Sequence, residues 1–93
     1  MELTDLPNIG PVLAENLRRV EITTLEELHS VGACEAWLRI RTRVDGGACF
    51  HQLTALAGAE SGIPKKALSS ERKAELRAFF DRAKSSETGI KNV

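Results

Sequence analysis

Apolar residues recur every three or four positions along most of the chain, which is the spacing of an α-helix with one buried face. No segment alternates apolar and polar residues in the way that predicts a half-buried strand. Tyrosine is absent and β-branched residues are sparse, which also argues against a sheet. We therefore predict an all-α fold, a compact bundle of about five short helices with a helix-hairpin-helix-like N-terminal part.

The first two helices have clear sequence boundaries. The first is predicted over residues 11–20, and its expected inward face comprises Val12, Leu13, Leu17 and Val20. Thr24 and Glu27 have the spacing of a capping box, in which the hydroxyl and the carboxylate each bind a backbone amide of the first turn. This pair predicts that a second helix follows Thr24, and Gly32 is its expected end.

Three further helices follow. The third is predicted over residues 33–43, and the fourth over residues 47–61 with Asp45 as its cap. Gly62 is the expected left-handed stop of the fourth helix. Ser69 is the expected cap of the fifth helix, which is predicted to reach Ala83.

Ninety-three residues with 42% hydrophobic content are enough for one small domain with a single core. We place this domain at residues 1–83 and expect a flexible tail at residues 84–93, which are polar and lack helical periodicity. The sequence contains no apolar run long enough to suggest a membrane span or a signal peptide. We therefore expect a cytoplasmic protein, without a membrane partner, whose two cysteines are reduced.

The tight turn Leu-Pro-Asn-Ile-Gly-Pro at residues 6–11 is typical of the start of a helix-hairpin-helix module. In such modules, backbone amides at the turn and at the following helix N-terminus bind a DNA phosphate. The alternative is that the turn only packs the first helix, since Pro11 lacks an amide hydrogen and no basic residue follows it. The candidate nucleic-acid-binding residues are Asn8, Ile9, Gly10, Val12, Arg18 and Arg19.

Charge gives only weak support for DNA binding. The formal net charge is zero, whereas domains that hold nucleic acid electrostatically usually carry a basic excess. Arg39 and Arg43 share a helical face, but Arg41 points elsewhere, near Trp37. Ordinary surface ion pairs are expected at the favourable spacing of Glu15 with Arg19 and of Glu35 with Arg39. A solvated helix surface is thus the simpler interpretation of these arginines.

The residue types that could support catalysis or metal binding do not form a motif. The four histidine and cysteine residues match no common zinc-site spacing, and the cysteines lie among apolar residues that predict burial: His29, Cys34, Cys49 and His51. The four aromatic residues have helical spacing with aliphatic neighbours, which favours core packing over base stacking: Trp37, Phe50, Phe79 and Phe80. We predict a protein that is not an enzyme and uses no metal or other cofactor.

Four segments in order carry a family resemblance: residues 6–17, 22–28 (Ile-Thr-Thr-Leu-Glu-Glu-Leu), 31–39 (Val-Gly-Ala-Cys-Glu-Ala-Trp-Leu-Arg) and 56–63. Together they resemble the C-terminal domain of the TfoX/Sxy regulators of bacterial competence, over residues 2–83. The resemblance implies a compact helical domain found beside an N-terminal TfoX domain or alone. Glu21 departs from the family, which commonly has glycine there, so it calls the geometry of this turn into question.

Full-length relatives promote competence-gene expression together with the cyclic-AMP receptor protein. Our first hypothesis is a regulatory domain that uses the hairpin and the adjacent helix for weak, sequence-independent contact with the DNA backbone, or that supports a transcription complex by binding a transcription-regulatory protein. The alternative is a protein-interaction module with no affinity for nucleic acid. The sequence leaves the oligomeric state open, and an uncovered ring at Phe79 or Phe80 would mark the surface of a homodimer or of another protein partner.

Overall fold

The computed structural model describes the backbone of residues 3–91 and the side chains of residues 3–84, and its regular elements in that part of the chain are all helical. The all-α prediction is therefore confirmed. The elements are η1 (Leu3–Asp5), α1 (Pro11–Arg19), α2 (Leu25–Val31), α3 (Ala33–Arg43), α4 (Phe50–Ser61), η2 (Lys65–Ala67) and α5 (Ser70–Lys91).

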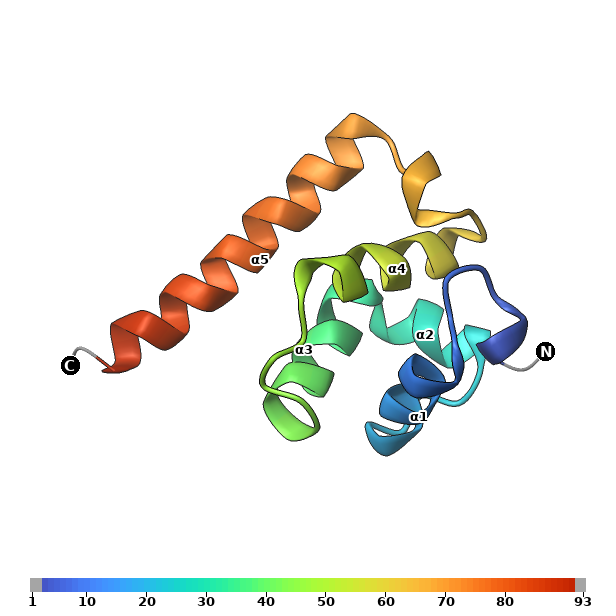
Figure 1. Cartoon of the computed structure of the whole chain (residues 1–93), viewed down its shortest axis with the longest axis horizontal. Helices are drawn as coiled ribbons and strands as arrows, with labels where there is room; N and C mark the ends of the chain where they lie inside the picture. Colours follow the sequence, from blue (N-terminus) through green and yellow to red (C-terminus); the bar gives the residue numbers. More distant parts are fainter. Residues whose placement is uncertain (1–2, 92–93) are drawn as a thin grey trace.

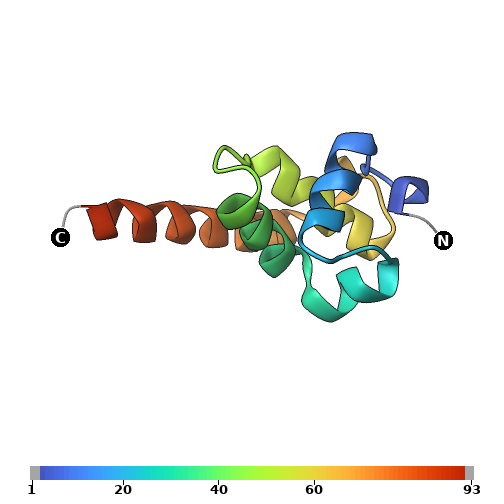
Figure 2. The same ribbon diagram turned by 90° about the horizontal axis from the view of Figure 1, so that it is seen from below.

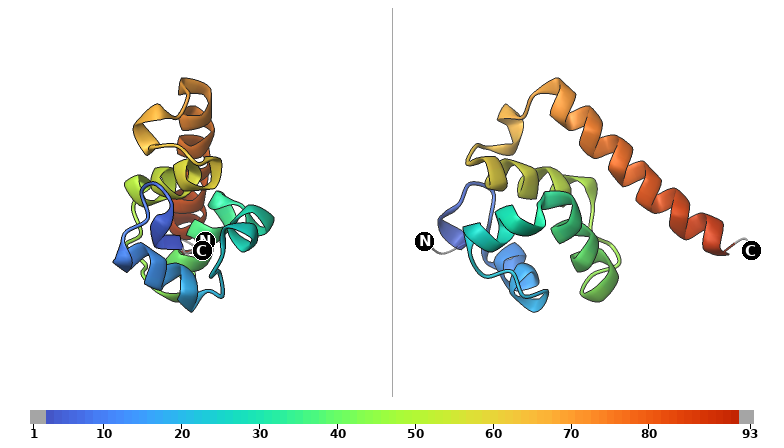
Figure 3. Two further views of the ribbon diagram at one scale, coloured as in Figure 1. Left: turned by 90° about the vertical axis from the view of Figure 1, so that its right-hand side faces the viewer. Right: turned by 180° about the vertical axis from the view of Figure 1, so that it is seen from behind.

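The helices form a compact body from which α5 extends. Helices α1, α2 and α3 lie on one side of α4, and α5 runs past its other side and continues beyond the body (Figures 1 and 2). The two ends of the chain therefore lie at opposite ends of the molecule. Figure 3 shows η2 close to the C-terminal end of α4, next to the loop that leads from η1 to α1. This corner of the fold contains the candidate site.

Helix α4 is the centre of the core. Every residue from position 53 to position 59 is buried, and the helix packs against α2, α3, α5 and η2. A helix that is buried on all sides needs apolar residues all around, and small ones where neighbouring backbones approach closely. The run of alanines with Gly58 supplies both.

An aromatic cluster docks α5 onto α3 and α4. Trp37 is fully buried, and its ring centre lies 6.0 Å from that of Phe79 and 5.4 Å from that of Phe80. Phe80 also meets Phe50 at 5.5 Å. The indole N–H of Trp37 donates a hydrogen bond to the carbonyl of Cys49 at 3.1 Å. The prediction that these aromatic residues pack in the core is confirmed. Trp37 and Phe80 are buried, and Phe50 and Phe79 are partly buried against the core.

The residue at position 21, in the turn between α1 and α2, has a conformation that is typical of glycine. Glu21 has φ of 67°, in the left-handed region that normally favours glycine. Its amide bonds the carbonyl of Arg18 at 2.9 Å, and the amide of Ile22 bonds that of Leu17 at 2.9 Å, which is the Schellman pattern. Gly62 occupies the same left-handed position after α4, as predicted. The chain thus keeps the glycine geometry at position 21 without the glycine.

Several predicted boundaries agree with the structure. Helix α3 has the predicted bounds, and the Thr24–Glu27 capping box is formed before α2. The Ser69 hydroxyl accepts a hydrogen bond from the Arg72 amide at 3.0 Å and so caps α5 as expected.

The predicted start of α4 is wrong. The helix begins at Phe50 instead of Gly47, and its N-cap is Cys49. Asp45 does not cap it, because its Oδ1 accepts a hydrogen bond from the Gly47 amide at 2.9 Å and so closes a turn within the loop. As the residue that precedes the helix, Cys49 is exposed, contrary to its expected burial.

Two further expectations differ from the structure. Val12 was expected to face inward but is 75% exposed, since the α1 stripe that meets the core is centred on Leu13 and Leu17. Helix α5 continues past Ala83 to Lys91. The side chains of residues 85–93, which include most of the predicted tail, lie outside the described residues. The division into a domain of residues 1–83 and a flexible tail of residues 84–93 stays a prediction.

Candidate nucleic-acid interface

The hairpin, residues 6–12, is anchored by two buried side chains. Leu6 and Ile9 are both in the core, and the Ile9 amide bonds the Leu6 carbonyl at 3.4 Å. Between them, Asn8 has φ of 71°, a left-handed conformation that asparagine tolerates better than most residues with a side chain. Asn8 therefore stands where many hairpins have glycine and has a comparable backbone conformation. Ile9 offers only its backbone to a ligand.

The Asn8 side chain ties the hairpin to a distant part of the chain. Its Nδ2 donates hydrogen bonds to the carbonyls of Ala55, at 3.4 Å, and Ile63, at 3.1 Å. Its Oδ1 accepts a hydrogen bond from the Lys65 amide at 3.2 Å. Both the nitrogen and the oxygen of the Asn8 side-chain amide are therefore hydrogen-bonded to the backbone of the protein. Asn8 thus shapes the interface, and its side chain is not aimed at a phosphate.

Gly58 makes this junction unusually close. A Cβ at this position would lie 2.6 Å from Asn8 Nδ2, 2.7 Å from the Ile63 carbonyl oxygen and 3.2 Å from Lys65 Cα. The Asn8 side chain of the hairpin and the backbone of residues 63–65 therefore both pack directly against the backbone of α4 at Gly58. We call this meeting point the Asn8–Gly58 junction. It fixes the hairpin relative to the η2 segment.

The N-terminus of α1 is the part of the hairpin that faces solvent. Gly10 is the N-cap, no side chain caps the helix, and Pro11 is its first residue. The first intrahelical bond is donated by the Ala14 amide to the Gly10 carbonyl at 3.0 Å. The amides of Val12 and Leu13 therefore have no acceptor within the helix. No acidic residue lies in the first turn to offset the positive end of the helix dipole.

The backbone conformation at position 10 does not require glycine. Its φ is −89° and its ψ is 178°, an extended conformation open to any residue. A Cβ there would meet nothing within 4 Å. A side chain at position 10 would therefore project into the space in front of the α1 N-terminus.

The two arginines of α1 are engaged in ion pairs. Arg18 and Arg19 both bind the carboxylate of Glu15, and the Arg19 contact measures 3.3 Å from Nε to Oε2. The hydrogen bond from Arg18 is the main cause that lowers the pKa of Glu15 below its ordinary value. All three side chains are substantially open to water, so the pairs are weak and can exchange partners.

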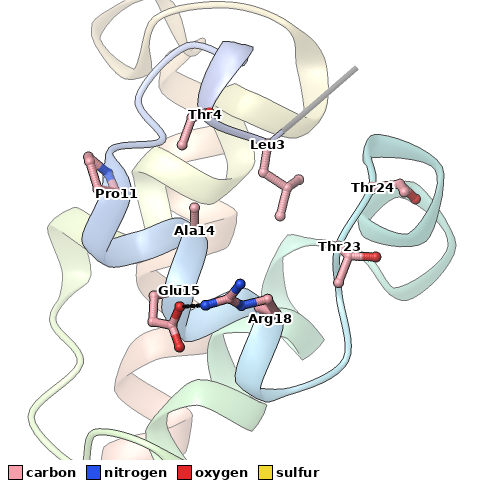
Figure 4. Close-up of a pocket in the computed structure, with 8 residues that line it drawn as sticks. All are labelled: Leu3, Thr4, Pro11, Ala14, Glu15, Arg18, Thr23 and Thr24. Atoms are coloured by element: carbon pink, nitrogen blue, oxygen red, sulfur yellow. Dashed lines mark hydrogen bonds and ion pairs between the residues drawn. The ribbon is translucent and has the colours of Figure 1, made fainter.

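A pocket of about 540 Å³ opens beside the hairpin, between η1, α1 and the start of α2 (Figure 4). Its lining combines apolar side chains with those of threonines and with the Glu15–Arg18 pair. The lining residues are Leu3, Thr4, Pro11, Ala14, Glu15, Arg18, Thr23 and Thr24.

Lys65 and Lys66 also belong to this corner of the molecule. Both are exposed, and neither forms a salt bridge within residues 3–84. In the sequence they stand directly after Pro64, in the connector between α4 and α5. Their proximity to the hairpin follows from the Lys65–Asn8 contact, which joins residues 57 positions apart and leaves no local pattern.

The arginines of α3 are divided as helical geometry predicts. Arg39 pairs with Glu35 at 3.1 Å. Arg41 lies over the Trp37 ring at 5.5 Å and donates a hydrogen bond to the Ala48 carbonyl at 3.0 Å. Because Arg41 is held against Trp37 and Ala48, the three arginines of α3 do not form a single basic patch.

The cysteines and histidines are candidates for metal ligands and for reactive groups. Within the described part of the chain, no three histidine, cysteine, aspartate or glutamate residues are grouped so that they could hold a metal ion. Burial raises the pKa of the half-buried Cys34 thiol, which lowers its reactivity at neutral pH. The described helices include none that is long and apolar enough to cross a bilayer.

The chain resembles solved structures over most of its length. An uncharacterised protein from Listeria monocytogenes, crystallised in a triclinic form, is 40% identical with a TM-score of 0.88, covering 90% of this chain and 94% of that one. A protein of unknown function from the same species, in a tetragonal form, is 42% identical with a TM-score of 0.83, covering 87% and 98%. No curated protein matches the chain. The family model of the TfoX C-terminal domain matches residues 1–80. The chain therefore belongs to the TfoX C-terminal domain family.

Proposed function

We propose that this protein is a non-enzymatic, cytoplasmic regulatory domain of a bacterium that contacts the DNA backbone weakly and without sequence specificity. The contact surface is the exposed N-terminus of α1. The Val12 and Leu13 amides bind a phosphate oxygen there, and Arg18 and Arg19 exchange Glu15 for neighbouring phosphates.

The observation that carries this proposal is the uncapped first turn of α1. Helices α2, α3 and α5 each have an acidic residue in the first turn, whereas α1, like α4, has neither an acidic residue nor a capping side chain there. A helix N-terminus in this state favours a bound anion, because its amides and its dipole both attract negative charge. The hairpin presents this end to solvent instead of burying it.

The family provides the biological context. TfoX/Sxy regulators promote competence-gene expression together with the cyclic-AMP receptor protein, which acts on DNA. A weak, sequence-independent contact would support such a transcription complex without choosing the site itself. The roles in competence and transcription are thus proposals that rest on family membership.

The test is an amide NMR titration with a short duplex of random sequence, at low and at high salt. We expect shifts at residues 8–13, 18 and 19 that fade as salt rises, because phosphate contacts release counterions. Val12→Asp should abolish them, since a carboxylate at this position would repel the phosphate and interact with the helix dipole itself. Val12→Asn is the matched neutral control and should retain binding. An unchanged wild-type spectrum at low salt would refute the proposal.

A second candidate function is a protein-interaction module with no affinity for nucleic acid. Val12 favours it, as it is the large hydrophobic side chain that is 75% exposed at the hairpin. The pocket beside η1 would receive part of such a partner. Under this function, DNA causes no shifts, and binding to the partner is insensitive to salt but lost in both Val12→Asp and Val12→Asn.

A further inference from the structure

Lys65 and Lys66 share one corner of the molecule with the hairpin, although more than fifty residues separate them in sequence. The Lys65 amide donates to Asn8 Oδ1 at 3.2 Å, and the Ile63 carbonyl accepts from Asn8 Nδ2 at 3.1 Å. Figures 1 and 3 show the hairpin and η2 meeting at the C-terminal end of α4. The lysine segment is thus held directly beside the hairpin.

The placement of this segment is defined by close packing at the Asn8–Gly58 junction. The missing Cβ of Gly58 lets the Lys65 backbone and the Asn8 side chain approach α4 within contact distance. A Schellman pattern fixes the chain that leads to η2, since Gly62 has φ of 75° and the Ile63 amide bonds the Gly58 carbonyl at 2.9 Å. Close packing at Gly58 and the Schellman hydrogen bond to its carbonyl therefore both set the position of the lysine backbone relative to the hairpin.

The charges of the two lysines are available to a ligand. Both residues are exposed, and neither is paired with a carboxylate in the described part of the chain. The two arginines of α1, in contrast, share Glu15. Flexible ammonium groups that bind as point charges suit successive phosphates, whose positions need only an approximate match.

We propose that Lys65 and Lys66 form the second half of the DNA contact surface and bind phosphates of the duplex that the α1 N-terminus engages. This inference rests on the proposed function. It assigns the η2 segment a binding role, and it makes the Asn8–Gly58 junction the element that aligns the two halves on one backbone.

The test measures the affinity for a labelled random duplex by fluorescence anisotropy between about 50 and about 200 mM salt. Each lost phosphate contact lowers the slope of log affinity against log salt by about 0.9. Lys65→Gln/Lys66→Gln should therefore reduce the slope by about 1.8, so the wild type loses about twelve times more affinity than the variant across this range. Arg43→Gln, which removes an exposed charge on α3, is the control and should leave the slope unchanged.

The outcomes separate the two proposals. If the wild type binds the duplex but the lysine variant keeps the wild-type slope, the lysine inference is wrong and the hairpin function stands. If Arg43→Gln lowers the slope as much per charge as the lysine changes do, the effect is one of net charge, and the lysine site is again refuted. If the wild type does not bind the duplex at low salt, both proposals fail together.

Discussion

Replacing Gly58 by alanine tests the tightest contact in the molecule. An added Cβ would lie 2.6 Å from Asn8 Nδ2 and 2.7 Å from the Ile63 carbonyl oxygen, both shorter than real Cβ contacts. The Asn8 side chain can swing away, but the Ile63 carbonyl is backbone and accepts the Asn8 bond that would be lost. The change therefore disturbs the packing and the hydrogen bonds at once.

The magnitude is the balance of three effects. Glycine to alanine inside a helix favours the folded state by about 1 kcal/mol. Overpacking costs about 1–3 kcal/mol. Displacing Asn8 removes hydrogen bonds that contribute about 1 kcal/mol each, and we expect one or two of its three to be lost. The expected net result is a decrease of about 1–4 kcal/mol in the free energy of unfolding.

The measurement is urea denaturation followed by far-ultraviolet circular dichroism. Gly46→Ala is the control, because a Cβ at that loop position would meet nothing within 4 Å. We expect it to change stability by less than about 0.5 kcal/mol. In an Asn8→Ala background, Gly58→Ala should cost less than in the wild type, since one obstructing group has been removed. A Gly58→Ala protein as stable as the wild type, or more stable, would refute the close-packed junction.

Three further predictions concern other parts of the fold. Glu21→Gly should stabilise the protein by up to about 1 kcal/mol in the same denaturation assay, because the left-handed φ costs glycine nothing. The pKa of Glu27 is lowered, chiefly by the hydrogen bond from the Thr23 hydroxyl, so its contribution is present above the unfolded pKa of about 4.3 and is lost as pH falls through the folded value. Glu27→Gln keeps a capping side chain but does not titrate, so its urea midpoint should fall less than the wild-type midpoint between about pH 5 and about pH 3. A disulfide reagent should modify the exposed Cys49 quickly and Cys34 slowly, because Cys34 is half-buried and its pKa is raised.

Each of these has a result that would contradict it. A destabilised Glu21→Gly variant would mean that the Glu21 side chain matters more than the backbone strain. Parallel acid titrations of wild type and Glu27→Gln would assign the pH dependence to other carboxylates. A Cys49→Ser protein that still reacted at the fast rate would show that Cys34 is open to the reagent.

Local patterns in the sequence predicted local features well. The bounds of α3, the capping box at Thr24 and the left-handed stop at Gly62 all depend on residues within a few positions of each other. The prediction failed where two local patterns competed. Asp45 had the right chemistry for a helix cap, but it closes a turn with Gly47, and α4 begins later.

The sequence predicted the hairpin part of the candidate site but not the part formed by η2. The two parts are far apart in the sequence and meet only in the folded chain. The hairpin motif marked the α1 N-terminus, yet the exposure of Val12 depends on how α1 packs, which the motif does not contain. The partners of Asn8 lie 47 to 57 residues away, at Ala55, Ile63 and Lys65. No periodicity or spacing rule relates such residues, so the placement of the lysines beside the hairpin came from the structure alone.

The fully buried Trp37 gives the protein a built-in optical probe. It is the single tryptophan of a chain without tyrosine, so it dominates the intrinsic emission. Its ring contacts Phe79 and Phe80 of α5, and its N–H binds the carbonyl before α4, so the emission reports whether α3, α4 and α5 are packed together. The hairpin and η2 contain no aromatic residue. A change in this emission therefore reports a change in the core, and a ligand that only occupies the hairpin and η2 surface should leave it unaltered.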